Sequence, residues 1–342
     1  MPTESFTRTD RKWAAVPIKE LGLTIQGTPL EPVLAEFVGE LERAGVTRVR
    51  PVFHLSTEWG VVGGTVAIGI PFYLAHPELT HFHAERVGFI EGYSRADILR
   101  YLRHEMGHVV NYAYLLHEQD EWARLFGRYD QPYVEDYKPS PFSRRFVQHL
   151  PGWYAQKHPD EDWAETFAVW MTPGRDWRAE YADWPGALAK LEYCDQTMKA
   201  LRDVDPPVND AELDEDVADL AYTLDDYYKG LADGAYEFPR RLDWMLKSIF
   251  EDEGRPESHA APPRRPASAL IRQLEPELLA QVFRWTGHFP EGTRLLLRHL
   301  AERAEALHQV YPEDREPQVT VALTTLVSAL AMNHVHHGSY IP

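Results

Sequence analysis

Apolar residues recur at helical spacing through much of this chain, and strand-like runs appear near its start. The apolar period predicts helices over 29–45, 94–118, 160–171 and 185–201, and three more over 269–285, 291–310 and 317–333. Strands are predicted in VTRVRPVFHLS and GTVAIGIPFYLA, and the glycines of GVVGGTVAIG favour a hairpin bend. The pattern thus predicts an α+β fold, with a small sheet and its helices followed by a mostly α-helical C-terminal region.

Breaks in the apolar period divide the chain into four regions. Residues 1–205 hold the predicted sheet and the first helices and are expected to form one domain. A tyrosine-rich helical extension is expected over 206–250. Residues 251–268 combine prolines, charges and small side chains, which predicts a linker. Residues 269–342 form a C-terminal helical region, which is a candidate surface for a protein partner or regulator.

Composition narrows the possible classes of function. The 342 residues include 53 acidic and 35 basic side chains, a formal net charge of −18 that repels phosphate backbones, so nucleic acid is not an expected partner. Cys194 is the only cysteine, which excludes an intramolecular disulfide and a zinc site built from several cysteines. The sequence shows no signal peptide and no run of 18 apolar residues, so we predict a cytoplasmic protein without a membrane partner.

The segment LRHEMGHVV carries the strongest candidate chemistry. It lies on the helix that begins at an S-x-x-D capping box over 94–97, and it places His104 and His108 four residues apart on one face. Two imidazoles in this relation can bind one zinc ion, and Glu105 is angled toward the open coordination position, where a general base is needed. Gly107 costs about 1 kcal/mol relative to alanine in a helix interior, which predicts that another element packs closely there.

Two histidines leave the site incomplete, because catalytic zinc usually keeps three protein ligands and one water. The run HPDEDWAETFAVW offers Glu161, Asp162 and Glu165 as the third ligand. Glu165 lies in the apolar part of its predicted helix, where an unpaired charge is costly and a metal ion can serve as its partner. Glu161 and Asp162 lie at the helix start, where acidic side chains are mostly solvated. Glu165 is therefore the favoured ligand.

A family resemblance rests on H-E-x-G-H followed by an A-E-x-F-A helix, and on the longer run FSRRFVQHLPGWYAQKHPDEDWAETFAVWMTPGRDWR. Over roughly residues 10–205 the chain resembles the bacterial Peptidase_Mx family of zinc-binding metallopeptidases. It is also similar to other glutamate zincins, including the catalytic domain of anthrax lethal factor. The resemblance implies a zincin-like domain in which His104, His108 and Glu165 bind Zn²⁺ and Glu105 is the catalytic base. Members often begin with a cysteine-bearing zinc ribbon, which this sequence lacks.

The resemblance also implies a residue that orients the first histidine and a donor to the oxyanion, and the residues for these two roles do not follow directly from the motif. Thermolysin-like relatives place an aspartate four residues after the ligand glutamate, but that position is Val169 here, which leaves Asp162 as a candidate to orient the first histidine. The oxyanion donor is Tyr154 by residue type or His158 by spacing, and a mere packing role for Tyr154 is the alternative. The substrate is expected to lie along an edge strand, and the glycines and Pro71 of GTVAIGIPFY favour that strand.

These observations favour a gluzincin-type zinc metallopeptidase acting on a peptide or protein substrate. Peptide bonds would be hydrolysed through a zinc-activated water with Glu105 as general base. The alternative hypothesis is a catalytically silent or occluded zinc-bearing scaffold. The C-terminal helices motivate this alternative, because a minimal peptidase does not need them.

Overall fold

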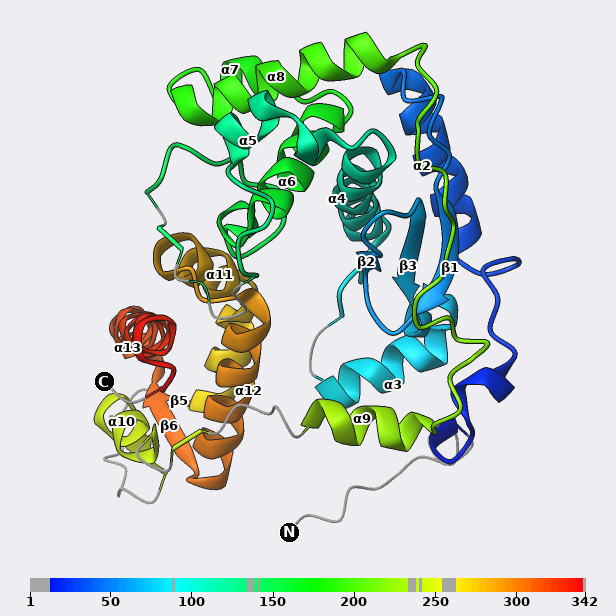
Figure 1. Cartoon of the computed structure of the whole chain (residues 1–342). Coiled ribbons are helices and arrows are strands. Elements are labelled where there is room, and N and C mark those ends of the chain that lie inside the picture. The colour runs from blue at the N-terminus through cyan, green and yellow to red at the C-terminus, as the bar shows by residue number, and fades with distance from the viewer. Residues whose placement is uncertain are drawn as a thin grey trace. The chain divides into compact units, whose positions relative to one another are not determined.

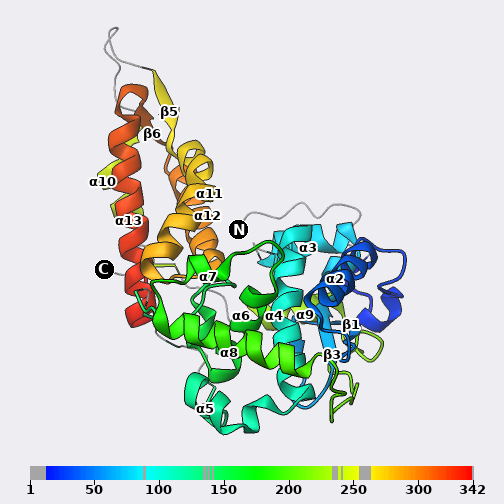
Figure 2. The ribbon, with the colours of Figure 1, turned by 90° about the horizontal axis from the view of Figure 1, so that it is seen from above.

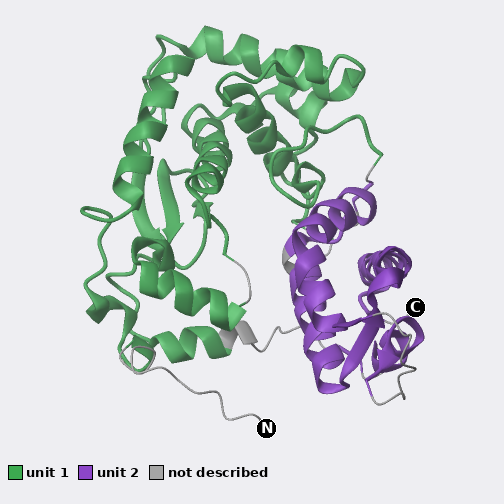
Figure 3. Cartoon of the chain, turned by 180° about the vertical axis from the view of Figure 1, so that it is seen from behind, with its two compact units in different colours: residues 1–137, 142–234 green, residues 138–141, 235–342 purple. Residues whose placement is uncertain are grey.

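The computed structural model describes residues 13–87, 90–133, 137, 139–140, 142–232, 238–239, 242–253 and 263–340. The chain forms two compact units, which Figure 3 shows in separate colours. Unit 1 comprises residues 1–137 and 142–234, and unit 2 comprises residues 138–141 and 235–342. The domain predicted over 1–205 therefore continues to residue 234, and the extension predicted over 206–250 is divided between the two units.

Unit 1 combines a three-stranded sheet with helices packed around it, which confirms the predicted α+β class. Its elements are η1 (Ile18–Leu21), α2 (Leu30–Ala44), β1 (Val52–Ser56), β2 (Gly60–Val61), β3 (Ala67–Pro71), η2 (Phe72–Ala75), α3 (Pro77–Val87), α4 (Arg95–Ala113), η3 (Leu116–Glu118), α5 (Asp120–Phe126), η4 (Tyr154–Gln156), α6 (Pro159–Met171), α7 (Trp177–Glu180), α8 (Pro185–Leu201) and α9 (Leu224–Ala232).

The sheet of unit 1 has the order β1-β3-β2. β1 and β3 are parallel, whereas β2 and β3 form the antiparallel hairpin predicted from GVVGGTVAIG, with Gly64 at its bend in a left-handed conformation. β3 lies between two partners and all five of its residues are buried, so the prediction that this strand is an edge was wrong. Pro71 is tolerated because it is the last residue of the strand. The edge strands of this sheet are β1 and β2.

Helix α4 occupies the centre of unit 1, between the sheet and α6 (Figure 1). Its start is fixed by the predicted capping box, since the Ser94 hydroxyl accepts a hydrogen bond from the Asp97 amide at 3.2 Å. α4 and α6 approach closely at Gly107, where an added Cβ would lie 2.6 Å from the Ala164 Cα. Trp163 of α6 donates its indole N–H to the Gly107 carbonyl at 2.8 Å. The close packing predicted from Gly107 is therefore confirmed.

The acidic segment 205–217, between α8 and α9, makes backbone hydrogen bonds to the sheet of unit 1. The Val217 amide donates to the Leu55 carbonyl at 3.0 Å, and the Val66 amide donates to the Asp210 carbonyl at 2.7 Å. This segment therefore belongs to unit 1, because its backbone hydrogen bonds are satisfied by β1 and by the turn before β3.

Unit 2 is a helical unit with a second three-stranded sheet, of order β4-β6-β5. Helices α11, α12 and α13 pack against one another around its core, as Figure 2 shows from above. Its elements are α10 (Leu242–Ile249), β4 (Glu251–Asp252), β5 (Arg264–Pro266), α11 (Ala267–Thr286), α12 (Pro290–Ala306), β6 (Gln309–Pro312), η5 (Glu313–Arg315) and α13 (Glu316–His337).

The linker predicted over 251–268 needs correction. Residues 251–252 and 264–266 at its two ends are strands that both pair with β6, so these ends belong to unit 2 instead of separating two units. Residues 254–262, the middle of the predicted linker, lie outside the described residues. The proline- and charge-rich composition therefore marks a connection between two strands of one sheet.

Among the described residues, one helix, Glu313–His337, has the length and composition of a membrane span, with a mean hydropathy of 1.3. A single helix of this kind is weak evidence for a membrane, because core helices have the same properties. One face of α13 indeed packs in the core of unit 2 through Val319, Leu323, Val327 and Leu330.

Candidate metal centre

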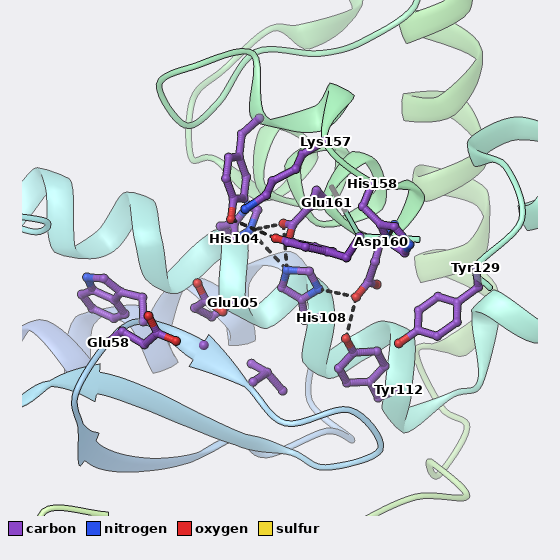
Figure 4. Close-up of a pocket in the computed structure, with 15 residues that line it drawn as sticks. Glu58, His104, Glu105, His108, Tyr112, Tyr129, Lys157, His158, Asp160 and Glu161 are labelled. Atoms are coloured by element: carbon purple, nitrogen blue, oxygen red, sulfur yellow. Dashed lines mark hydrogen bonds and ion pairs between the residues drawn. The ribbon is translucent and has the colours of Figure 1, made fainter. Parts of the chain in front are cut away.

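The close crossing of α4 and α6 brings three buried side chains together. His104 and His108 project from one face of α4, and Glu161 projects toward them from the first turn of α6 (Figure 4). The two histidine Nε2 atoms lie 3.2 Å apart, and Glu161 Oε2 lies 3.0 Å from His104 Nε2 and 3.3 Å from His108 Nε2. These three atoms form a nearly equilateral triangle.

This triangle fits a zinc ion. Zinc binds imidazole nitrogen and carboxylate oxygen at about 2.0–2.2 Å, so neighbouring donor atoms in a tetrahedral site lie roughly 3.3 Å apart. The three donor atoms are already at that spacing, and all three side chains are buried. With three protein ligands, the fourth position of a tetrahedral site stays available for water or substrate.

Glu165 lies at a different place from the one predicted. It is fully buried, and its Oε1 lies 2.9 Å from Nδ1 of His104, on the opposite side of the ring from the donor triangle. The backbone N–H groups of His149 and Leu150 also donate to this carboxylate, both at 2.9 Å. Glu165 is thus a buried charge with three hydrogen-bond partners of its own, and the physical argument that it needs a metal as partner does not hold.

His108 has a matching carboxylate on its own outer nitrogen. Asp160 Oδ2 lies 3.0 Å from His108 Nδ1 and accepts a hydrogen bond from the Tyr112 hydroxyl at 2.5 Å. The other oxygen of Asp160 accepts a bond from the Asn111 amide at 2.6 Å. Such partners fix the tautomer and the ring orientation of metal-binding histidines. Sequence reasoning did not assign this role to Asp160.

Asp162 does not orient either histidine. It forms a buried ion pair with Lys190, at 2.5 Å, on the side of α6 away from the triangle. Burial raises the pKa of its carboxyl group to about 7, although the charge of Lys190 opposes this shift. Asp162, the candidate for orienting the first histidine, therefore stabilises the contact between α6 and α8 instead.

Electrostatics at the triangle favour a cation. Burial lowers the pKa of His104, but hydrogen bonds that its ring donates to Glu161 and Glu165 outweigh burial and raise this pKa to about 9. For His108 burial is likewise outweighed by the charges of Asp160 and Glu161, which raise its pKa well above the usual range. A divalent cation can supply the positive charge that the carboxylates favour, so metal uptake is coupled to proton release.

Glu105 lies beside the triangle and lines the same cavity. Its side chain is directed toward the β2 side of the cavity, as Figure 4 shows. Burial raises the pKa of its carboxyl group, and the neighbouring His104 and His108 partly oppose this shift. A buried carboxylate with a raised pKa is suited to take up and return a proton.

Tyr154 and His158, the two candidate oxyanion donors, occupy different environments. The Tyr154 ring lies 5.5 Å from the His104 ring, and burial raises the pKa of its hydroxyl, which therefore keeps its proton and can donate. His158 accepts a hydrogen bond from the Asp160 amide at Nδ1, and its Nε2 lies 3.1 Å from the Gln131 carbonyl. Nδ1 of His158 thus caps α6, and Nε2 contacts the loop that follows α5.

The cavity at this site has a volume of about 570 Å³, within the range of small-molecule and peptide sites. It lies within unit 1, and its walls come from the β2 segment, α4, the residues after α5, and the start of α6. The lining residues are Glu58, Trp59, Gly60, Val61, His104, Glu105, His108, Tyr112, Tyr129, Tyr133, Tyr154, Lys157, His158, Asp160 and Glu161.

No match was found among curated proteins or among solved structures. A family model does match, over residues 58–180, and this segment contains the whole donor triangle and Glu105. The zinc-binding description of that family, together with the buried cluster of His104, His108 and Glu161, confirms Zn²⁺ as the predicted cofactor. Over these residues the match also confirms the resemblance to the Peptidase_Mx family found in the sequence, because the model is that of this family, described as "Putative zinc-binding metallo-peptidase".

Proposed function

We propose that the protein is a zinc-dependent peptidase of the gluzincin type, with a zincin-like arrangement in unit 1. The observation that carries this proposal is the donor triangle of His104, His108 and Glu161, with Glu105 next to it in the same cavity. The family match supports a metallopeptidase in this segment of the chain. A cavity over the triangle favours an enzyme over the alternative of an occluded scaffold, because a substrate has room to reach the ligands.

We assign Glu161 as the third ligand in place of Glu165. Glu165 and Asp160 then act as positioning residues, one on each histidine. With Glu161 as ligand, the acid four residues later is Glu165, which takes the place of the aspartate that thermolysin-like relatives use to orient the first histidine. Val169, which follows Glu165 by four residues, is therefore no longer the position at which an orienting acid is expected.

Zinc bound at this triangle would lower the pKa of a coordinated water to near neutrality and polarise the substrate carbonyl. Glu105 would accept the proton of the attacking water and return it to the leaving amine. Tyr154 would donate its hydroxyl proton in a hydrogen bond to the oxyanion that develops on the carbonyl. Gly60 and Val61 of β2 line the cavity, so β2 is the strand along which we propose the peptide lies.

The decisive test replaces Glu105 with glutamine, which keeps the shape of the side chain but cannot accept a proton. We expect Glu105→Gln to retain one zinc ion per chain and to lose peptide cleavage by about 10²–10⁴-fold. The exposed Glu118 lies outside the cavity, and Glu118→Gln is the matched control that keeps full activity.

A proteome-wide cleavage screen is the appropriate assay, because it samples many peptide sequences at once and does not require a defined substrate. Sites cut by the wild type and by Glu118→Gln, but not by Glu105→Gln, would support a peptidase. The same sites cut by Glu105→Gln would exclude the proposed base. Full zinc binding with no differential cleavage would favour the scaffold.

A further inference from the structure

The two oxygens of Glu161 have different neighbours. Oε2 faces the two histidines, whereas Oε1 accepts a hydrogen bond from the Tyr133 hydroxyl at 2.6 Å. A carboxylate held in this way offers one oxygen to a metal and cannot turn both toward it without losing the bond to the phenol. We infer that Tyr133 is a positioning residue that keeps Glu161 a one-oxygen ligand, and this inference rests on the zinc site proposed above.

The bond to Glu161 also fixes the direction of the neighbouring hydrogen bond. A carboxylate can only accept, and a phenol has one proton, so Tyr133 must donate it to Glu161. Without substrate, the Tyr154 hydroxyl therefore donates its proton to the Tyr133 hydroxyl, 3.3 Å away. A single chain of hydrogen bonds thus runs from Tyr154, the candidate oxyanion donor, through Tyr133 to the ligand carboxylate. To donate to an oxyanion, as proposed above, Tyr154 would have to give up this contact.

Packing holds the Tyr133 ring in this position although its side chain is half exposed. The Lys157 ammonium lies 4.4 Å from the centre of the Tyr133 ring and 5.2 Å from that of Tyr154, within the range of cation–π attraction. The His158 ring packs on the Tyr133 ring at 5.4 Å. Lys157 and His158 directly precede α6, so the residues that support Tyr133 move with the helix that carries Glu161.

Each member of the donor triangle then has one partner that sets its orientation. Glu165 holds His104, Asp160 holds His108 and Tyr133 holds Glu161. The consequence for the metal is its coordination number. If Glu161 binds through one oxygen, the fourth position stays open for water, whereas two-oxygen binding would fill part of it.

The test compares Tyr133→Phe with the wild type and with Tyr93→Phe, a change at a tyrosine that is 77% exposed and outside the cavity. Zinc affinity is measured by chelator competition, and Co²⁺ is substituted to read coordination from its visible absorption, which weakens as the coordination number rises from four to five. We expect Tyr133→Phe to lower zinc affinity by about tenfold and to weaken the Co²⁺ bands. Tyr93→Phe should match the wild type in both measurements.

The outcomes separate this inference from the proposed function. Equal zinc affinity and equal Co²⁺ spectra for Tyr133→Phe and wild type would overturn the role of Tyr133 while leaving the zinc site intact. Failure of the wild type to bind either metal would overturn the zinc site itself, and the inference with it. The melting temperature of the metal-free proteins is also compared, because a phenol that only positions Glu161 must not be needed for folding. Unfolding of Tyr133→Phe before metal is added would therefore contradict the inference.

Discussion

Gly107 offers the most direct perturbation of the metal centre that touches no ligand. Replacing it with alanine adds a single Cβ at the crossing of α4 and α6. That atom would lie 2.6 Å from the Ala164 Cα and 3.0 Å from its carbonyl oxygen, and ordinary contact begins at 3.4 Å. The obstacle is backbone, which cannot turn away as a flexible side chain can. The two helices must therefore separate at this point.

Two opposing effects determine the size of the change. Alanine in place of glycine gains about 1 kcal/mol of helix stability. Overpacking at a tight contact costs about 1–3 kcal/mol, and a backbone obstacle puts Gly107→Ala at the upper end. We expect a net loss of about 2 kcal/mol in the free energy of unfolding. Because metal–ligand distances tolerate changes of about 0.2 Å, separation of α4 from α6 should also weaken zinc binding at least tenfold.

Gly39 is the matched control for this variant. It also lies inside a helix, α2, but its added Cβ would meet only the end of the Arg43 side chain, at 3.2 Å. Gly39→Ala should therefore be neutral or stabilise the fold by up to about 1 kcal/mol and leave zinc binding unchanged. Denaturant unfolding and zinc competition measure both effects. Equal stability and equal zinc affinity for the two alanine variants would refute the reasoning.

Two further predictions concern the ligand assignment and the response to acid. Glu165→Gln should weaken zinc binding by about 10–100-fold, because Glu165 acts through His104, and Glu161→Gln should weaken it by more. Chelator competition measures both variants and would show the reverse order if Glu165 were the ligand. His288 is buried in unit 2 between the Thr293 and Tyr340 hydroxyls, and burial lowers its pKa to about 3. Since the unfolded chain takes up the proton and the folded chain does not, the stability that neutral His288 contributes should be lost as pH falls, by about 2 kcal/mol between pH 7 and pH 5. Hydrogen exchange of the backbone amides in α11–α13 should show this loss for the wild type and not for His288→Gln; equal losses would contradict the assigned pKa.

The helices were predictable because their signals are local. Pro29 and Gly45 bound α2 as the sequence indicates, Ser94 and Asp97 cap α4, and the bounds of α8 agree with the predicted range. Each of these signals acts within one turn of the chain. The hairpin bend predicted from the glycines of GVVGGTVAIG is likewise local, and Gly64 adopts a left-handed backbone there.

Strand order and unit boundaries were not predictable, because they depend on partners distant in sequence. β3 reads as an edge strand from its glycine and proline, yet β1 and β2 pair with its two sides. The stretch over 251–268 reads as a linker, yet its ends pair with β6, about fifty residues further along the chain. Composition reports what a segment tolerates and gives no information on which other strand satisfies its hydrogen bonds.

The choice of Glu165 over Glu161 as the predicted ligand was wrong for the same reason, because it depends on how α6 packs against α4. The two acids are four residues apart on α6 and therefore share one helical face, so periodicity alone cannot separate them. The expectation that Glu161 is solvated at the helix start was wrong, because both acids are buried. Glu165 meets two backbone amides and His104, and Glu161 meets two imidazoles and a phenol. What distinguishes them is which nitrogen of His104 each one meets. Glu165 reaches Nδ1, which cannot face the same point as Nε2 of His108, whereas Glu161 reaches the Nε2 atoms of both histidines. The ligand role therefore follows from the level at which α6 crosses α4, and Gly107 permits that close crossing because it has no Cβ to collide with Ala164.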